Sequence, residues 1–428
     1  MRVEWNQRAR SDAYYYVANA RRKQAKAEFL STAEPIVAAI RSACSRIHTA
    51  ESEPRRALEI GCGPGRLMLG MRESFDEVHG VDVSDDMVAL ARENLAHVPS
   101  MFVHRCSGSD LAGLPPDYFD FVYSYAVFQH IPRAAVVTRY LEESARVLKP
   151  GGVLACQLRG APTASWQNLG DDDTWFGCVY PPGELLAVCR RCGLELLQVT
   201  GIETLYTWVV GRRHGQAGTS PFDLEKAIVK AVTPTANPLG MISRRGPGAG
   251  FHCWLEGFPE SLSLERLEVT AAGLPAAACY ISEHLGRGGF QLNVLMPLDC
   301  PCGNALVRLA CDGRRVKGEH VIQVGEYPDP TPAVVSVTDG ADLLADRAST
   351  TGTLKIMLCG VTNADAVGFA IGSQPVKATR AVLYDAYIFG YEFTLTLPDD
   401  LPAGPHAVVI TASGWSESVE FTNCPAGE

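Results

Sequence analysis

Three glycines at alternate positions could hold a ligand against bare backbone. Gly61, Gly63 and Gly65 follow a short apolar run at residues 57–60. Glycines spaced in this way let a buried strand turn sharply into a helix, and they leave room for a ligand beside the main chain. A dinucleotide-binding loop has the spacing Gly-x-Gly-x-x-Gly, and here Arg66 occupies the place of its third glycine. The loop therefore predicts a ligand other than a dinucleotide, or a tight turn that holds no ligand.

Carboxylates follow the glycine loop at positions where they can bind an adenosine. Asp82 ends a strand-like run at 77–82, where a carboxylate can hold both hydroxyls of a ribose. Asp110 follows a third run at 102–104 and can accept a hydrogen bond from an adenine amino group. Glu59 adds a carboxylate inside the first run. Together with the glycines, these residues describe an adenosine that carries no pyrophosphate.

The elements that must position these residues alternate between strand and helix. Strand-like runs cover residues 56–60, 77–82, 102–104, 118–124, 152–158, 194–202 and 206–210, and helical patterns cover 66–75, 84–95 and 133–148. Ser84 is predicted to cap the second of these helices. Regular alternation predicts an α/β fold with a mainly parallel sheet and helices on both faces. A mainly helical segment at about 12–47 precedes the sheet.

The second half of the chain repeats itself. Its short β-rich runs are separated by Pro, Gly and Asp, and a set of turn residues recurs at a spacing of 101: 297, 299, 301, 303, 307 and 313 match 398, 400, 402, 404, 408 and 414. The pattern predicts two small antiparallel β-sandwiches in tandem. We therefore expect an α/β domain at 1–212, a linker at 213–221, and β-sandwich repeats at 222–328 and 329–428.

Composition limits the classes of partner and location. The chain has 428 residues and a net charge of −10, which argues against a surface that coats nucleic acid. Because it begins without a signal peptide and contains no run of about 18 apolar residues, we expect no membrane segment and a cytoplasmic location. The 14 cysteines divide into two odd sets of seven, which favours reduced thiols. Cys189 and Cys192 have metal-ligand spacing but lack a second pair, so we predict no metal site.

Residues 50–212 resemble the class I S-adenosylmethionine-dependent methyltransferases. The matching segments are residues 58–65, 80–84, 108–111, 119–124 and 147–152. The resemblance implies a doubly wound, seven-stranded sheet with one reversed strand, and S-adenosylmethionine as the cofactor. It also implies a set of cofactor contacts: Gly61, Gly63, Gly65, Tyr125 and Gln129 at the methionine end, Asp82 at the ribose, and Met87, Asp110 and Leu111 at the adenine, with Glu59, Val83 and Ser109 beside them.

Methyl transfer from a sulfonium needs little from the protein beyond holding two reactants in line. A general base helps when the acceptor must lose a proton, and His130 is the candidate, with packing as the alternative role. Tyr15 and Tyr16 are expected to wall the acceptor pocket or to belong to the core. Arg159 can pair with an acidic substrate or with the acidic loop at 171–173, and Trp175 beside that loop is a further substrate candidate.

The β repeats resemble, loosely, immunoglobulin-like modules appended to bacterial proteins, which bind, space or dimerise. Three hypotheses remain open from the sequence. The first is an enzyme that methylates an O, N, S or C atom of a small molecule, with the β repeats serving docking or assembly. The second is an enzyme that methylates a protein or peptide recruited by the β repeats. The third is a binding or structural protein whose nucleotide fold has lost its activity.

Overall fold

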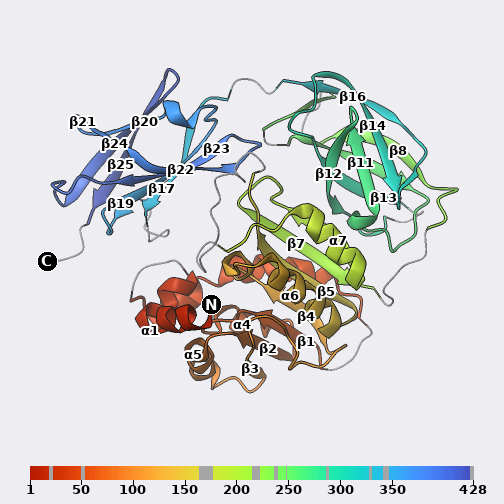
Figure 1. The fold of residues 1–428 in the computed structure, drawn as a ribbon, viewed down its shortest axis with the longest axis horizontal. Coiled ribbons are helices and arrows are strands. Elements are labelled where there is room, and N and C mark those ends of the chain that lie inside the picture. The colour runs from red at the N-terminus through yellow and green to blue at the C-terminus, as the bar shows by residue number, and fades with distance from the viewer. Residues whose placement is uncertain are drawn as a thin grey trace.

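The computed structural model describes three parts of the chain, an α/β domain followed by two β units (Figure 1). The described residues are 1–18, 23–49, 54–162, 177–214, 222–235, 240–246, 248–285, 289–326, 330–340 and 347–424. The predicted substrate residue Trp175 and most of the predicted linker lie outside them. The α/β character of the first half and the β-rich character of the second half are confirmed.

The α/β sheet has the strand order β3-β2-β1-β4-β5-β7-β6. Neighbouring strands are parallel except β7, which runs antiparallel to both β5 and β6. The strands are β1 (Arg56–Ile60), β2 (Glu77–Asp82), β3 (Met101–Arg105), β4 (Phe119–Ser124), β5 (Leu148–Arg159), β6 (Leu194–Thr200) and β7 (Tyr206–Arg213). Strand β7 extends one residue into the predicted linker, because Arg213 still pairs with Leu194.

Two hydrophobic cores cover the two faces of this sheet, since successive side chains of a strand point to opposite sides. On β1, Leu58 belongs to the core shared with α6 (Ala134–Val147) and α7 (Pro182–Cys192). Its neighbour Ala57 belongs to the core shared with α3 (Glu34–Ser42), α4 (Arg66–Met71) and α5 (Asp85–Leu95). Helices therefore lie on both faces, as the alternation of strand and helix predicted.

The N-terminal helical segment begins earlier than predicted. Helix α1 (Arg2–Ala18) starts ten residues before the predicted position 12, is interrupted at Asp12, and precedes α2 (Lys26–Ser31). Its first half docks on the start of α5 through polar pairs: Arg2 Nε donates to Asp85 at 2.8 Å, and Ser84 Oγ donates to Asn6 at 2.6 Å. Periodicity of apolar residues does not detect a helix that is attached through polar side chains.

The two β units share one topology, which accounts for the repeat in the sequence. The first unit pairs its strands in the orders β8-β10-β13-β12 and β12-β11-β14-β16-β9, and the second pairs them as β17-β19-β23-β22 and β21-β20-β24-β25-β18. In both units the last pair of the second order is parallel. The matching turns use glycine in the left-handed region, with φ of 72° at Gly313 and 84° at Gly414.

The strands of the first unit are β8 (Ile228–Pro234), β9 (Met241–Ser243), β10 (Gly250–Glu256), β11 (Leu267–Ala271), β12 (Leu274–Ile281), β13 (Gly289–Leu295), β14 (Gly303–Cys311), β15 (Arg314–Arg315) and β16 (His320–Gly325). Those of the second unit are β17 (Ala333–Asp339), β18 (Ala348–Ser349), β19 (Thr353–Cys359), β20 (Gly368–Ile371), β21 (Gln374–Val376), β22 (Ala378–Asp385), β23 (Gly390–Thr396), β24 (Gly404–Ala412) and β25 (Trp415–Asn423). Within the described residues, no helix combines the length and apolar character needed to cross a membrane.

The first β unit is joined to the α/β domain through a continuous core. Apolar residues of α7 and β6 belong to the same buried cluster as those of β10 to β14. The buried Glu265 carboxylate accepts a hydrogen bond from the Leu196 amide at 2.7 Å, and the Glu265 carbonyl accepts one from Arg190 at 2.6 Å. Tyr280 of β12 pairs with Gln198 of β6. The α/β domain and the first unit are therefore packed as one body.

Candidate functional site

The glycine loop turns at the carboxyl end of β1 with every glycine in the left-handed region. Gly61, Gly63 and Gly65 have φ of 73°, 49° and 84°, which residues other than glycine rarely adopt. The loop is held to the neighbouring strand because the Gly61 amide donates to the Val81 carbonyl at 2.8 Å. A Cβ atom on Gly61 would lie 2.4 Å from the side chain of Val127. The backbone of Gly61 therefore comes as close to the loop after β4 as glycine alone allows.

Asp82 joins the glycine loop to the start of α5. Its carboxylate accepts hydrogen bonds from the Gly63 amide at 2.9 Å and from the Ser84 amide at 2.8 Å. Burial raises the pKa of Asp82, while these two amides oppose the rise. Ser84 in turn caps α5, as predicted, by accepting from the Met87 amide at 3.1 Å. The two Asp82 oxygens together offer about four acceptor positions, so the carboxylate keeps capacity for a ligand hydroxyl.

Glu59 is buried behind the loop, with 3% of its surface exposed. It accepts a hydrogen bond from the Tyr123 hydroxyl at 3.1 Å. Burial raises the pKa of Glu59 to about 8, and the Tyr123 hydroxyl and Arg66 only partly oppose that rise. At neutral pH the carboxyl group is therefore mostly protonated, and a cation brought beside it would favour its ionised form.

A cavity of about 110 Å³ lies between the glycine loop, the end of β2, the loop after β4 and helix α1. Helix α1 covers it, and Trp5 and His130 pack in a T-shaped arrangement with ring centroids 5.3 Å apart. Most predicted cofactor and catalytic residues line this cavity, together with one of the predicted acceptor residues: Glu59, Gly61, Gly63, Asp82, Val83, Met87, Tyr125, Gln129, His130 and Tyr16.

Other predicted residues lie outside this cavity. Gly65 packs against Leu95, and Tyr15 is buried with 6% of its surface exposed. Ser109 does not line the cavity, and Asp110 and Leu111 line a second cavity of about 560 Å³, which shares Cys106 with the first. Thirteen further lining residues were not among the predicted site residues, and Met1, Trp5, Val17, Cys106 and Tyr140 are examples. The sequence could have indicated Trp5 and Tyr140 by their aromatic side chains, but an aromatic residue on a helix usually marks a core position.

Arg159 holds a neighbouring segment of the chain. Its Nη1 donates to the Gly177 carbonyl at 2.6 Å, and the Arg159 carbonyl accepts from the Tyr180 amide at 2.9 Å. Gln157, two residues earlier on β5, accepts from the amide of Ala126 at 3.2 Å. Ala126 lines the cavity, so the carboxyl end of β5 fixes the backbone of the loop after β4.

The pH dependence of stability will report on Glu59. Its pKa of about 8 in the folded chain lies above the ordinary value of 4.5, so the folded state binds more protons between these values. The free energy of unfolding should therefore fall as the pH rises from about 5 to about 8, and Asp82, whose pKa is also raised, contributes with the same sign. Glu59→Gln should remove most of this decline in chemical denaturation series. Glu73→Gln is the matched control, because Glu73 is 70% exposed; an unchanged slope in E59Q would contradict the assignment.

Comparison with known proteins finds relatives for the part of the chain that contains the glycine loop and Asp82. Residues 58–156 match the family described as "Methyltransferase domain". A trans-aconitate 2-methyltransferase of Rhodopseudomonas palustris is 38% identical over 109 residues, which cover 25% of this chain and 39% of that protein. A ubiquinone biosynthesis O-methyltransferase of Azoarcus is 27% identical over 162 residues, covering 35% and 67%. A crystal structure of an S-adenosylmethionine-dependent methyltransferase from Methanosarcina mazei is 20% identical, with a TM-score of 0.32 over 39% of this chain and 95% of the other.

Proposed function

From the premise that residues 58–156 belong to a class I S-adenosylmethionine-dependent methyltransferase domain, we propose that the whole chain transfers a methyl group to a small-molecule acceptor. The observation that carries the proposal is the cavity in which the glycine loop, Asp82 and Glu59 meet. Its residues fit the cofactor, since Gly61 and Gly63 bring bare backbone to the cavity and the Asp82 carboxylate can accept from ribose hydroxyls. The two relatives named above carry names of small-molecule methyltransferases.

The cofactor, when bound, supplies a methyl group already activated by its sulfonium. The chain's own residues have to bind the cofactor and the acceptor, orient them and exclude water. Asp82 would hold the ribose, and Glu59 would offset the positive charge of the methionine end as its carboxyl ionises. Trp5 and Tyr16 close the cavity from the side of α1. For an acceptor that must lose a proton, His130 is the candidate base, because its imidazole lines the cavity beside Gln129.

The second β unit contacts the α/β domain through the turn between β6 and β7. The turn between β6 and β7 pairs with the turn between β22 and β23: the Leu205 amide donates to the Tyr384 carbonyl, and the Ala386 amide donates to the Glu203 carbonyl, both at 3.1 Å. The Leu205 carbonyl accepts from the Gly160 amide at 2.9 Å. A chain of backbone hydrogen bonds therefore links the second β unit to the carboxyl end of β5.

Tyr206 lies at this junction and remains 48% exposed. Its register partner on β5 is Arg159. The pKa of Tyr206 is raised by partial burial and by the charges of Glu392 on β23 and Tyr125, and Arg159 opposes the rise, so these side chains share one electrostatic environment. We propose that Glu392 and Tyr206 form one side of the acceptor entrance. In this proposal the second β unit helps to select the acceptor.

The test uses the full chain. Calorimetry should detect binding of S-adenosylhomocysteine, after any cofactor that copurifies has been removed, and tritiated methyl groups should pass from S-adenosylmethionine to members of a panel of small carboxylic acids and phenols. No binding would overturn the proposal. Label confined to added protein extract would instead support a protein acceptor. Glu392→Gln should raise the KM for the best acceptor by about tenfold, as loss of one charged hydrogen bond does, without changing cofactor affinity; Glu417→Gln on β25 is the control.

A further inference from the structure

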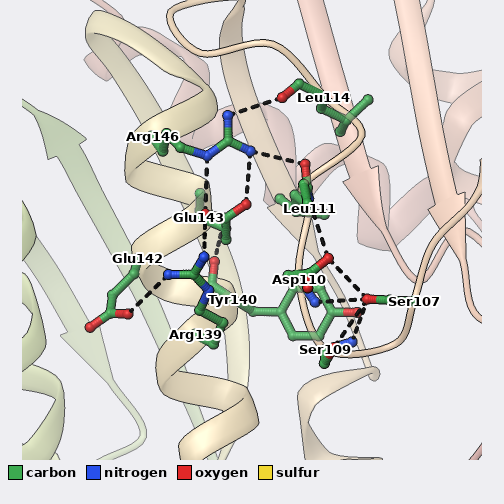
Figure 2. Close-up of polar contacts among 12 residues, drawn as sticks. Ser107, Ser109, Asp110, Leu111, Leu114, Arg139, Tyr140, Glu142, Glu143 and Arg146 are labelled. Carbon is green, nitrogen blue, oxygen red and sulfur yellow. Dashed lines mark hydrogen bonds and ion pairs between the residues drawn. The ribbon is translucent and has the colours of Figure 1, made fainter.

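The loop that follows β3 is shaped by its own serine. The Ser107 hydroxyl accepts hydrogen bonds from the Ser109 amide at 3.1 Å and the Asp110 amide at 3.2 Å, and it donates to the Asp110 carboxylate at 3.0 Å (Figure 2). The Asp110 carboxylate also accepts from the Ala112 amide at 3.3 Å. These contacts fold the first half of the loop. In its second half, residues 111–114, the Leu114 amide donates to the Leu111 carbonyl at 2.9 Å, and further hydrogen bonds come from helix α6.

Arg146 of α6 fixes that second half. Its Nη2 donates to the Leu111 carbonyl at 2.9 Å, and its Nη1 donates to the Leu114 carbonyl at 3.0 Å (Figure 2). The same guanidinium binds both oxygens of Glu143, at 3.0 Å through Nε and 2.8 Å through Nη2. The Glu143 side chain is 4% exposed. Hydrogen bonding within the pair lowers the pKa of Glu143 and raises that of Arg146, so both partners stay charged at neutral pH.

Helix α6 also reaches the cofactor cavity. Tyr140, six residues before Arg146, lines that cavity beside Cys106, and the Cys106 sulfur lies 3.7 Å from the Tyr140 hydroxyl. Gly108 of the loop lines the same cavity, and a Cβ atom there would lie 2.6 Å from Val83. The helix that carries the Arg146–Glu143 pair therefore contacts both the loop and the end of the cavity that the loop closes.

We propose that Arg146 is a positioning residue for recognition of the adenine end of the cofactor. Arg146 acts through the loop 107–114, which carries Asp110. This proposal rests on the proposed function. A planar guanidinium can serve two carbonyls and a carboxylate at once, whereas a lysine ammonium lacks this fixed fork. By holding the loop before the ligand arrives, Arg146 removes the entropy cost of ordering it at binding.

The test compares Arg146→Ala and Arg146→Lys with Arg139→Ala. Arg139 is the matched control, because it lies on the same helix and contacts the same Glu143 at 3.3 Å, but it is 54% exposed and stands away from the loop in Figure 2. Calorimetry would measure S-adenosylhomocysteine and S-inosylhomocysteine, in which oxygen replaces the adenine amino group. R146A should weaken binding of the adenine form by about tenfold and erase most of its preference over the inosine form. R139A should keep both affinities within about twofold.

A wild-type preference in R146A, or an equal loss in R139A, would overturn the proposal. If R146A does not fold, R146K decides, since it keeps the charge beside Glu143 and lacks the fork. Amide hydrogen exchange of residues 107–114 without ligand gives a readout that does not depend on the proposed function. Exchange should accelerate in R146K and stay unchanged in R139A. Wild-type protein that binds neither compound would defeat the proposed function, whereas unchanged exchange in R146K would defeat the positioning role.

Discussion

Replacing Asp82 with alanine should weaken binding of S-adenosylhomocysteine by at least about 100-fold. Asp82 is 9% exposed and lines the cavity at the end of β2, where its oxygens already face the amides of Gly63 and Ser84. A ribose would add two hydrogen bonds to a buried carboxylate, and each such bond contributes about 1.5–3 kcal/mol. The loss of two gives the expected factor. Calorimetry on purified full-length protein measures it directly.

The folded state should survive this substitution. Burial raises the pKa of Asp82, so the folded chain holds its carboxylate at a cost, and removing it offsets part of what the two unpaired amides lose. Asp76→Ala is the matched control, because Asp76 is exposed and lies before the other end of the same strand. It should bind the ligand as the wild type does. Equal affinity in D82A and D76A would refute the ribose role of Asp82.

Local signals in the sequence were sufficient for the centre of the site. The glycine loop, the acid at the end of β2 and the Ser84 cap are each specified by residues a few positions apart, and the fold places them where the spacing predicts. Such features follow from backbone conformations that few residue types can adopt. The recurrence at a spacing of 101 was equally informative, because it comes from turns that the two β units share.

Long-range polar contacts were beyond the reach of the sequence. Helix α1 covers the cavity because Arg2 and Asn6 bind Asp85 and Ser84, about 80 positions away along the chain. No apolar pattern marks that contact, so the sequence does not indicate that Trp5 lines the cavity. The attachment of the first β unit depends in the same way on Glu265, whose partner, the Leu196 amide, lies 69 positions away. A single buried hydrogen bond between distant elements leaves no periodic trace in a sequence.

Removing Asp120 should produce the largest loss of stability among the substitutions considered. Asp120 is fully buried at the amino end of β4, where it accepts from the Thr49 hydroxyl, the Arg56 amide and Lys149 Nζ, each at 2.8 Å. Asp120→Ala removes the carboxylate that the Lys149 ammonium, 16% exposed, contacts at 2.8 Å, and it takes an acceptor away from the Arg56 amide and the Thr49 hydroxyl. Breaking one side of such a pair costs about 3–5 kcal/mol. Urea unfolding followed by circular dichroism measures this loss in the α/β domain.

A second substitution separates the loss of the ion pair from the lost packing. Lys149→Met in the D120A background removes the ammonium that faced Asp120 and keeps its apolar stem, so the double variant should recover about half of the lost free energy. Asp120 lies at the opposite end of the sheet from the cavity, which forms at the carboxyl ends of β1, β2 and β4. Folded D120A should therefore bind S-adenosylhomocysteine with wild-type affinity. If D120A unfolds with the wild-type free energy, or if the double variant recovers none of the loss, then the ion pair between Asp120 and Lys149 does not stabilise the fold.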